Sequence, residues 1–548
     1  MIGRSLHEYI FIRICIALVR YPVIPYAAVL TACLIGAKHG QPQPQNRWAT
    51  AARWIVGLMV VEVAYAVLIW MPYRNNLKAA AKHPAPSSPD ARQALFDRCM
   101  ATVTDPEHYI RGWFLGADLT DIRRDNVREF LLWAFLDQAA GDRPGPESQE
   151  VDQYVAQIEV MLGRPFEPGR GPAKCLRLTL DDVETKYRSV WWYAIIALLD
   201  AATHMFLVAH GFQYYAQPKE ETFAVFPPRV QQLISRRRSS TGLGYWYLPH
   251  ERSDCSPVVF FHGIGIGLWI YIRFLADISA AKKHGKGRIG IIALEILPVS
   301  FRLTKPPLGK DAFLEQLTGI IDHHDWDRFV LTCHSYGSVL ATHVLRCSEL
   351  QARIPSAVLV DPVSILLHLP DVAYNFTRRQ PKTANEWQLW YFASTDPGVA
   401  HCLGRYFFWR ENAIWAEELA GLSESPIGIR ETRSHAADER RNARRVTVCL
   451  SGQDLIVDSH AVASYLTEVG QRNDPAYVQG NEGKQGRRNV AASQARFKAE
   501  LERQHGQGQS ANSGIDVLWF PDHDHAQVFD SKRERRRIVD VVRGYCEE

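Results

Sequence analysis

The chain carries little net charge and lacks the patterns of several specialised protein classes. Its 63 Lys and Arg residues stand against 59 Asp and Glu residues, and this net charge of +4 is too small to indicate nucleic-acid binding. No run of Lys and Arg alternates with aromatic residues, so we expect no nucleic-acid partner. The ten cysteines are scattered along 548 residues, which argues against a disulfide scaffold and fits a reducing compartment.

Metal-binding and export signals are also missing. The sequence has no HExxH motif and no paired CxxC motif, so we expect no metal and no organic cofactor. No basic stretch, short apolar core and small-residue cleavage site precede a soluble domain, so we expect no cleaved signal peptide. No internal repeat is present. The informative features are therefore local motifs and long apolar runs.

The stretch 333–337, Cys-His-Ser-Tyr-Gly, carries the strongest chemical signal. An apolar run typical of a β-strand precedes it at 328–332, and a helix-like run follows at 338–345. A strand, a sharp turn and a helix form the context of a nucleophile elbow, which exposes one serine above the edge of a sheet. Cysteine replaces the glycine that usually stands two residues before that serine. The alternative is a buried strand followed by an ordinary helix-capping serine, so Ser335 is a candidate nucleophile.

A glycine-rich turn lies upstream, after an apolar strand-like run at 257–261. Gly263 there would let the backbone approach a substrate closely. The backbone N–H groups of Ile264 and Tyr336 are then the candidate donors of an oxyanion hole. A phosphate-binding loop over 262–267 is the alternative, but the glycines are out of register for G-x-G-x-x-G and no suitable acidic residue follows.

Three carboxylates compete for the role of the triad acid. Asp454 follows the strand-like run 446–450 after a glycine turn, and this place in the chain order favours it. Asp458 lies four residues further on. Asp361 ends the strand-like run 357–360, from which some lipases take their acid.

A histidine after the last strand-like run, 515–520, would complete the order Ser, Asp, His. His525 precedes an apolar helix start and is favoured, with His523 as the alternative base. A metal site formed by His523, Asp524 and His525 is a competing interpretation. Adjacent side chains alternate in direction along a chain, so such a site would be strained.

From Thr241 to its C-terminus the chain resembles the α/β-hydrolase superfamily, because all of these signals occur in that superfamily's order and each follows a predicted strand. The flanks 334–338 and 524–529 also resemble membrane-anchored hydrolases of fungi. The resemblance implies an α/β-hydrolase fold, a mostly parallel sheet flanked by helices. It matches three residues to the superfamily's triad: Ser335, Asp454 and His525.

Long apolar runs near the N-terminus predict membrane attachment. Trp54–Tyr73 is close to a full bilayer span, with one charge at Glu62. A hairpin buried against the hydrolase is the alternative. With two spans, basic residues are more frequent on the outer flanks, which predicts a cytosolic hydrolase domain. The run 190–210 contains Asp200 and His204, which are costly in lipid, so we favour an interfacial or packed helix over a span.

These signals predict three regions. Residues 1–83 are expected to form membrane-anchor helices, 84–218 a helical subdomain containing the run 190–210, and 219–548 the hydrolase domain. The segment 363–445 is far longer than an ordinary connection and rich in large apolar side chains, so it predicts a helical lid. Those side chains can form the lid core or an acyl pocket. The segment 470–513 has few large apolar residues and predicts a disordered insertion.

The function expected from the sequence is a membrane-anchored serine hydrolase that cleaves a lipid ester or another hydrophobic ester. One alternative is an acyltransferase with the same triad, because His525 and Asp530 fit an H-x-x-x-x-D pattern. The other is an inactive membrane scaffold on a hydrolase fold. The expected partners are the bilayer and the ester, and the sequence indicates no oligomeric state.

Overall fold

The computed structural model describes residues 2–38, 47–139, 147–280, 287–422, 443–472, 509–510 and 515–548. Within them, nine strands form one sheet in the order β1-β2-β4-β3-β5-β6-β7-β9-β8. The strands are β1 (Gln213–Tyr215), β2 (Tyr245–Leu248), β3 (Val258–Phe261), β4 (Ile291–Leu294), β5 (Val330–His334), β6 (Ser356–Val360), β7 (Arg445–Ser451), β8 (Gln509–Ser510) and β9 (Ile515–Phe520). The pairs β1–β2, β2–β4 and β8–β9 are antiparallel, and all other pairs are parallel.

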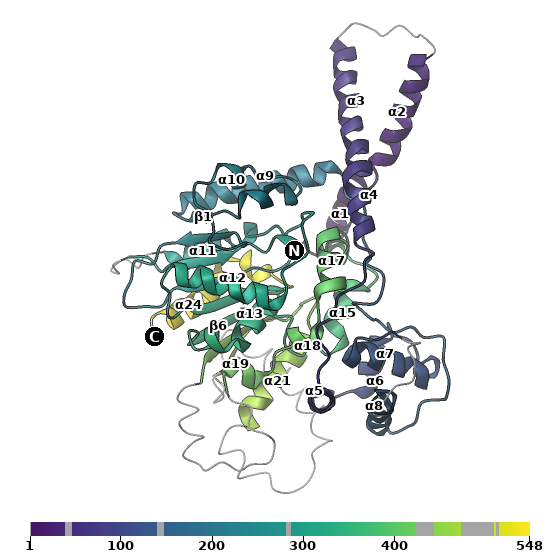
Figure 1. Cartoon of the computed structure of the whole chain (residues 1–548), viewed down its shortest axis with the longest axis vertical. Helices are drawn as coiled ribbons and strands as arrows, with labels where there is room; N and C mark the ends of the chain where they lie inside the picture. The colour runs from purple at the N-terminus through teal and green to yellow at the C-terminus, as the bar shows by residue number, and fades with distance from the viewer. Residues whose placement is uncertain are drawn as a thin grey trace.

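Continuous apolar runs form the central strands because both faces of the sheet are covered. Val258 and Phe260 of β3 belong to a cluster with helices α11 (Ile272–Ser279) and α24 (Lys532–Cys546). Val259 and Phe261 point to the opposite face and pack with α12 (Lys310–His323) and α13 (Gly337–Arg346). A mostly parallel sheet between helices agrees with the fold that the sequence predicts (Figure 1).

The hydrolase region has seven further described helices outside the predicted lid. They are η3 (Lys219–Ala224), α10 (Val230–Ile234), η4 (Trp269–Tyr271), η5 (Leu297–Val299), α14 (Ser348–Gln351), α21 (Ser459–Arg472) and η7 (Gln527–Phe529).

Helices occupy the described part of the predicted lid, between β6 and β7. They are α15 (Pro370–Thr377), α16 (Ala384–Gln388), η6 (Leu389–Ser394), α17 (Pro397–Tyr406), α18 (Trp409–Asn412) and α19 (Ala416–Ala420). Residues 423–442 of the predicted lid lie outside the described residues, as do 473–508 and 511–513 of the predicted insertion.

The helical subdomain consists of α5 (Pro89–Thr102), α6 (Pro106–Trp113), η2 (Leu119–Asp121), α7 (Arg124–Leu136) and α8 (Glu147–Leu162). Its apolar cluster includes Trp415, which precedes α19, so these helices pack against the predicted lid segment. The predicted boundary after residue 218 is wrong in one respect. Strand β1 lies inside the range 84–218 but pairs with β2, because its Tyr214 side chain packs in the core of the sheet.

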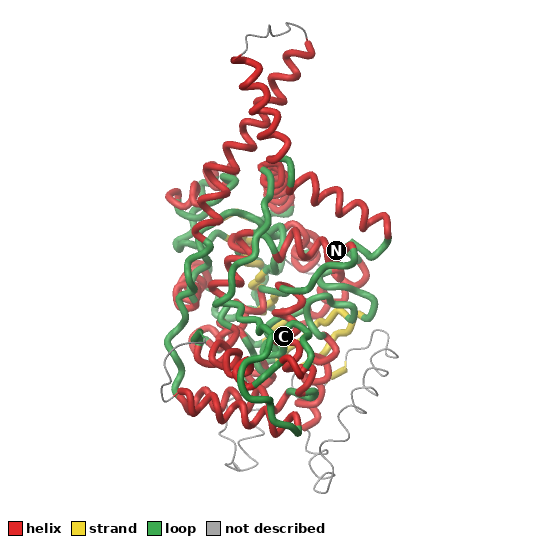
Figure 2. Tube along the Cα trace, turned by 90° about the vertical axis from the view of Figure 1, so that its right-hand side faces the viewer, coloured by secondary structure: helices red, strands yellow, loops and turns green. Residues whose placement is uncertain are grey.

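The N-terminal helices are α1 (Leu6–Arg20), α2 (Val23–Lys38), α3 (Arg47–Tyr65), η1 (Ala66–Trp70) and α4 (Met71–Asn76), and α9 (Val190–Ala209) lies beside the sheet domain. Figures 1 and 2 show α2 and α3 extending away from the globular body. Two helical stretches are long and apolar enough to cross a membrane, Thr50–Asn76 and Val190–Ala209, and a third would be the bent pair α1–α2.

Candidate active site

Ser335 occupies the sharp turn between β5 and α13. Its φ angle is 51°, in the left-handed region that residues other than glycine rarely adopt. Its N–H donates to the Val360 carbonyl at 2.9 Å, which fixes the turn against β6. Gly337 is required two residues later, because a side chain there would overlap the Phe261 carbonyl. This backbone has the strand–turn–helix geometry of a nucleophile elbow.

A hydrogen-bonded chain joins the three residues selected from the sequence. The Ser335 hydroxyl lies 2.8 Å from Nε2 of His525, and Nδ1 of His525 lies 2.7 Å from Oδ2 of Asp454. The other oxygen of Asp454 accepts the N–H groups of Ile456 and Val457 at 2.7 and 3.0 Å. This backbone grip fixes the carboxylate, which in turn fixes the imidazole. The arrangement has the geometry that triad catalysis needs, and the catalytic roles themselves stay predictions.

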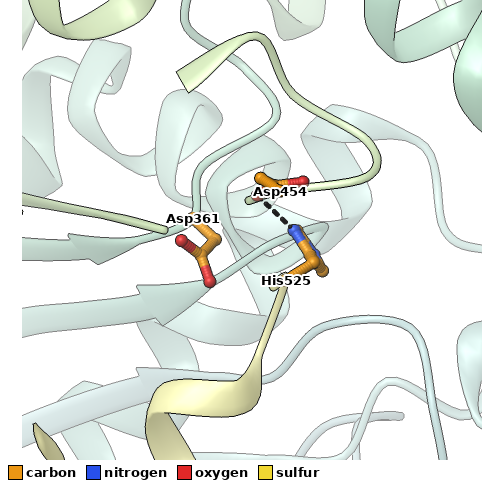
Figure 3. Close-up of side chains that lie close together, drawn as sticks. All are labelled: Asp361, Asp454 and His525. Atoms are coloured by element: carbon orange, nitrogen blue, oxygen red, sulfur yellow. Dashed lines mark hydrogen bonds and ion pairs between the residues drawn. The ribbon is translucent and has the colours of Figure 1, made fainter. Parts of the chain in front are cut away.

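The alternative acids occupy different positions. Asp361 is buried beside the same histidine (Figure 3). Its oxygens, however, accept the N–H and hydroxyl of Ser451 and the N–H of Ala526, at 2.9 to 3.1 Å. Asp458 is exposed and accepts the N–H of Ala461 at 3.0 Å. Neither is hydrogen-bonded to the imidazole, so the geometry favours Asp454 as its partner.

The alternative base, His523, does not reach Ser335. Its ring lies against Phe520, and its carbonyl accepts the N–H of Gln453. The Asp524 carboxylate does not join His523 and His525 in a metal site. It accepts hydrogen bonds from the N–H groups of Leu455 and His525, at 3.0 and 2.7 Å. It therefore ties the loop of the acid to the loop of the base.

Two backbone donors belong to residues beside Ser335 in the pocket. Within the described residues, neither the Ile264 N–H nor the Tyr336 N–H has a hydrogen-bond acceptor, and both residues line the pocket over Ser335. Gly263, the third residue predicted for this hole, donates its N–H to the Tyr271 hydroxyl at 3.2 Å. Its contribution is space, because a Cβ there would lie 2.8 Å from the Cβ of Ser335.

His334 and Tyr271 form a buried pair that the sequence did not single out. The Tyr271 hydroxyl accepts the Gly263 N–H at 3.2 Å and is hydrogen-bonded to Nδ1 of His334 at 2.7 Å. Burial lowers the pKa of His334 well below its usual 6.5, which keeps the ring neutral. Nε2 of His334 lies 4.0 Å from Oδ2 of Asp361. This pair links the glycine turn to the residue before the nucleophile.

An apolar pocket covers Ser335. Its empty volume is about 640 Å³, including the part open to solvent. The predicted lid segment contributes Leu367 and Phe407, among others, and the helices between residues 89 and 162 contribute Trp113 and Trp133. The sequence suggested the lid as a source of pocket residues, but not the helical subdomain. In the sequence, the pattern of these tryptophans indicated only packing within helices. Their place in the pocket depends on the tertiary fold, which brings them beside the predicted lid.

The electrostatics around His525 favour a charged imidazole. Burial, the largest influence, lowers its pKa, but the charge and hydrogen bond of Asp454, with smaller contributions from Asp361 and Asp524, raise it to about 9. Burial and the charge of Asp454 together raise the pKa of Asp361. The site therefore stabilises the imidazolium that forms when a serine gives up its proton.

One set of side chains has the composition of a cation site. Donor atoms of Asp361, Asp454 and His525 all lie within 4.8 Å of one another. The interactions just described already engage these atoms: Asp454 bonds to His525, and Asp361 accepts three hydrogen bonds. The donors are thus arranged to hold an imidazole rather than an ion.

No protein-family model and no curated protein matches the chain. Its structure is similar to that of a membrane phospholipase A described as a bacterial virulence factor, at 12% identity over 65% of this chain and 94% of that chain, with a TM-score of 0.32. Carboxylesterase CesB from Bacillus subtilis is 12% identical, with 56% and 90% covered and a TM-score of 0.29. A meta-cleavage product hydrolase from Pseudomonas fluorescens IP01 is 17% identical, with 55% and 94% covered and a TM-score of 0.29.

Proposed function

We propose that the chain is a membrane-attached serine hydrolase that cleaves a carboxylic ester with an apolar acyl group. One observation carries this proposal: Ser335, His525 and Asp454 form a continuous hydrogen-bonded chain at the base of an apolar pocket. The positive φ of the serine and two free N–H groups beside it add independent support.

In the first half of the reaction, Ser335 attacks the ester carbonyl while Nε2 of His525 takes the hydroxyl proton. Asp454 holds the proton on Nδ1 and stabilises the imidazolium. The carbonyl oxygen becomes an oxyanion, to which the Ile264 and Tyr336 N–H groups donate. His525 then returns its proton to the leaving alcohol, and an acyl-serine remains.

In the second half, a water molecule gives a proton to Nε2 of His525 and attacks the acyl carbon. The same two N–H groups stabilise the second oxyanion. Collapse of this intermediate breaks the bond to Ser335, and the imidazolium reprotonates the serine oxygen. The net reaction converts an ester and water into an acid and an alcohol, without an added cofactor.

The substrate class follows from the walls of the pocket. Trp113, Trp133, Leu367 and Phe407 offer a hydrophobic surface and no charged group, so an acyl chain gains free energy when it leaves water. The helices α2 and α3 attach the protein to a bilayer, where such acyl groups are concentrated. The proposed substrate is therefore a membrane lipid ester.

The test uses the full-length protein in detergent or vesicles with a fluorophosphonate probe. Ser335→Ala should abolish labelling, while Ser240→Ala, at an exposed serine, should leave it intact. Retained labelling of Ser335→Ala would identify another nucleophile. Hydrolysis of glycerolipid esters, followed by product analysis with and without an acceptor lipid, separates a hydrolase from an acyltransferase, and turnover at background would favour the inactive scaffold.

A further inference from the structure

Helix α9 has an inverted distribution of polar side chains. Its outward face is a stripe at helical spacing that includes Trp191, Ile195, Leu198 and Met205, all exposed, and Leu198 is 71% exposed. Its inward face carries Asp200 among buried apolar residues. A helix on the surface of a water-soluble domain has the opposite arrangement, so the outward face needs an apolar or amphipathic neighbour.

The inward face attaches α9 to the sheet domain through buried charges. Asp200 accepts a hydrogen bond from Arg229 at 2.9 Å and pairs with Arg302 at 3.0 Å. Arg229 also bonds to Glu295, which follows β4, at 2.6 Å. Both arginines are almost fully buried. Removing α9 from the body to cross a bilayer would separate these charges, which is strongly unfavourable.

The apolar surface continues beyond α9. Phe223 in η3 is 78% exposed, and Val230 and Ile234 in α10 are 67% and 68% exposed. Helix α10 contacts both α9 and η3. In Figure 1, α9 and α10 lie along the end of the globular body from which α2 and α3 extend. We call the outward side chains of α9, η3 and α10 the apolar platform.

Unpaired positive charge lies directly beside the apolar platform. Arg236 and Arg237 follow α10, and both are exposed. Within the described residues, neither side chain has a hydrogen bond or an ion pair. Glu220 is the exposed acidic neighbour in η3, and Glu221 is paired with Lys305 at 2.8 Å. Basic side chains at the rim of an apolar face fit the anionic headgroups of a membrane surface.

We propose that the apolar platform lies in the plane of a bilayer, with its side chains at the headgroup–acyl boundary and Arg236 and Arg237 at anionic headgroups. The occupant is the lipid surface that α2 and α3 enter, because the platform lies at the same end of the body. This inference rests on the membrane attachment proposed above and adds a second, in-plane contact. That contact fixes the orientation of the globular body relative to the lipid.

The test measures depth in vesicles of phosphatidylcholine and phosphatidylserine with the full-length protein. A fluorescent amino acid is incorporated singly at Trp191, Leu198 or Met205, and quenching is compared between lipids with a nitroxide on the headgroup and lipids with one near the chain end. An in-plane α9 places all three probes at one shallow depth, about 5–10 Å into the boundary. A spanning α9 would place Leu198 near the midplane and the outer two near the surfaces, which would overturn the proposal.

Two control positions separate this inference from membrane attachment itself. A probe at Leu58 in α3 should be deep, and a probe at Val160, exposed on α8, should be in water. If Leu58 is deep while Leu198 is in water, the in-plane contact is wrong and the attachment stands. If Leu58 is also in water, the attachment fails with it.

The charge contribution has its own test, with the probe kept at Leu198. Each arginine contributes about fivefold to association with an anionic surface. Replacing phosphatidylserine by phosphatidylcholine, or making Arg236→Gln and Arg237→Gln together, should therefore weaken headgroup quenching at Leu198. Equal quenching in both lipids for the unmodified protein would refute the role of these arginines.

Discussion

The proton affinity of His525 should set the pH dependence of the reaction. Asp454 and Asp361 raise its pKa from 6.5 to about 9 against the opposing effect of burial. This shift corresponds to about 3 kcal/mol in favour of the protonated imidazole. Only the neutral imidazole can accept the serine proton. At pH 7 about one molecule in a hundred is then neutral at His525. The rate of attack by Ser335 should rise about tenfold for each unit of pH and level off above pH 9.

The assay is the second-order rate constant for inactivation by a fluorophosphonate, measured from about pH 6 to pH 10. Asp361→Asn removes a charge that raises the pKa of His525, so the midpoint of the pH–rate profile of this variant should move to lower pH. Asp458→Asn is the matched control, because this exposed carboxylate does not touch the imidazole. A rate that is already constant above pH 7 would mean that burial outweighs the two carboxylates, and it would refute this account.

Three further substitutions test the construction of the site. Gly263→Ala would place a Cβ 2.8 Å from that of Ser335 and should lower kcat by about 10²–10³, as much as the loss of an oxyanion donor. The control Gly265→Ala should be tolerated, because no atom lies within 4 Å of the added Cβ. Equal activities of the two variants in ester hydrolysis would contradict this prediction. Val372→Trp should fill the pocket. It should lower kcat/KM for long-chain p-nitrophenyl esters at least tenfold, to about the value for p-nitrophenyl acetate. An unchanged ratio of the long-chain value to the acetate value would place the acyl chain elsewhere. Tyr271→Phe removes the hydroxyl that joins Gly263 to His334, so it should lower the free energy of unfolding by about 1–3 kcal/mol in a denaturant titration. An unchanged midpoint would show that the Tyr271–His334 pair is not stabilising.

The positions of strands β3, β5 and β7 along the chain and the position of the elbow were predictable because each depends on local signals. A short apolar run that ends in a small-residue turn predicts a buried strand followed by a functional loop, and this pattern occurs before Ile264, Ser335 and Asp454. The structure has strands at the predicted places, β3, β5 and β7. Parallel strands bring their carboxyl ends to one edge of the sheet, so proximity of the three loops followed from topology.

Chain order in the sequence favoured Asp454 as the acid but did not exclude Asp361. Asp361 and Asp454 both follow strands and both lie beside His525, and they differ in which groups hold them. Backbone N–H groups of the acid's own loop turn Asp454 towards the imidazole, whereas Ser451 and Ala526 hold Asp361 away from it. The hydrogen bonds that hold Asp361 join segments 90 and 165 residues apart in the chain, so no local pattern records them.

Glu62 shows how a partner changes the meaning of a charge in an apolar run. In the sequence it is the one charge of a predicted span at Trp54–Tyr73. In the structure its side chain is fully buried, and it accepts hydrogen bonds from the Tyr187 hydroxyl and the Val190 N–H. Trp54 before it is exposed, and Tyr65 after it is buried in the core of the sheet domain. Glu62 therefore marks the level at which this helix leaves the body.

Helix α9 begins at that same level, because Val190 is its first residue. The part of α3 that leaves the body before Glu62, from Arg47 to Val61, is 15 residues long, about 22 Å at 1.5 Å per residue. This is shorter than a hydrocarbon core of about 30 Å. With α9 in the plane of the membrane at the level of Glu62, α3 cannot cross the bilayer with its exposed part alone. We therefore expect the α2–α3 hairpin to enter the lipid from the side of the globular body, which keeps α1 and α4 on that side.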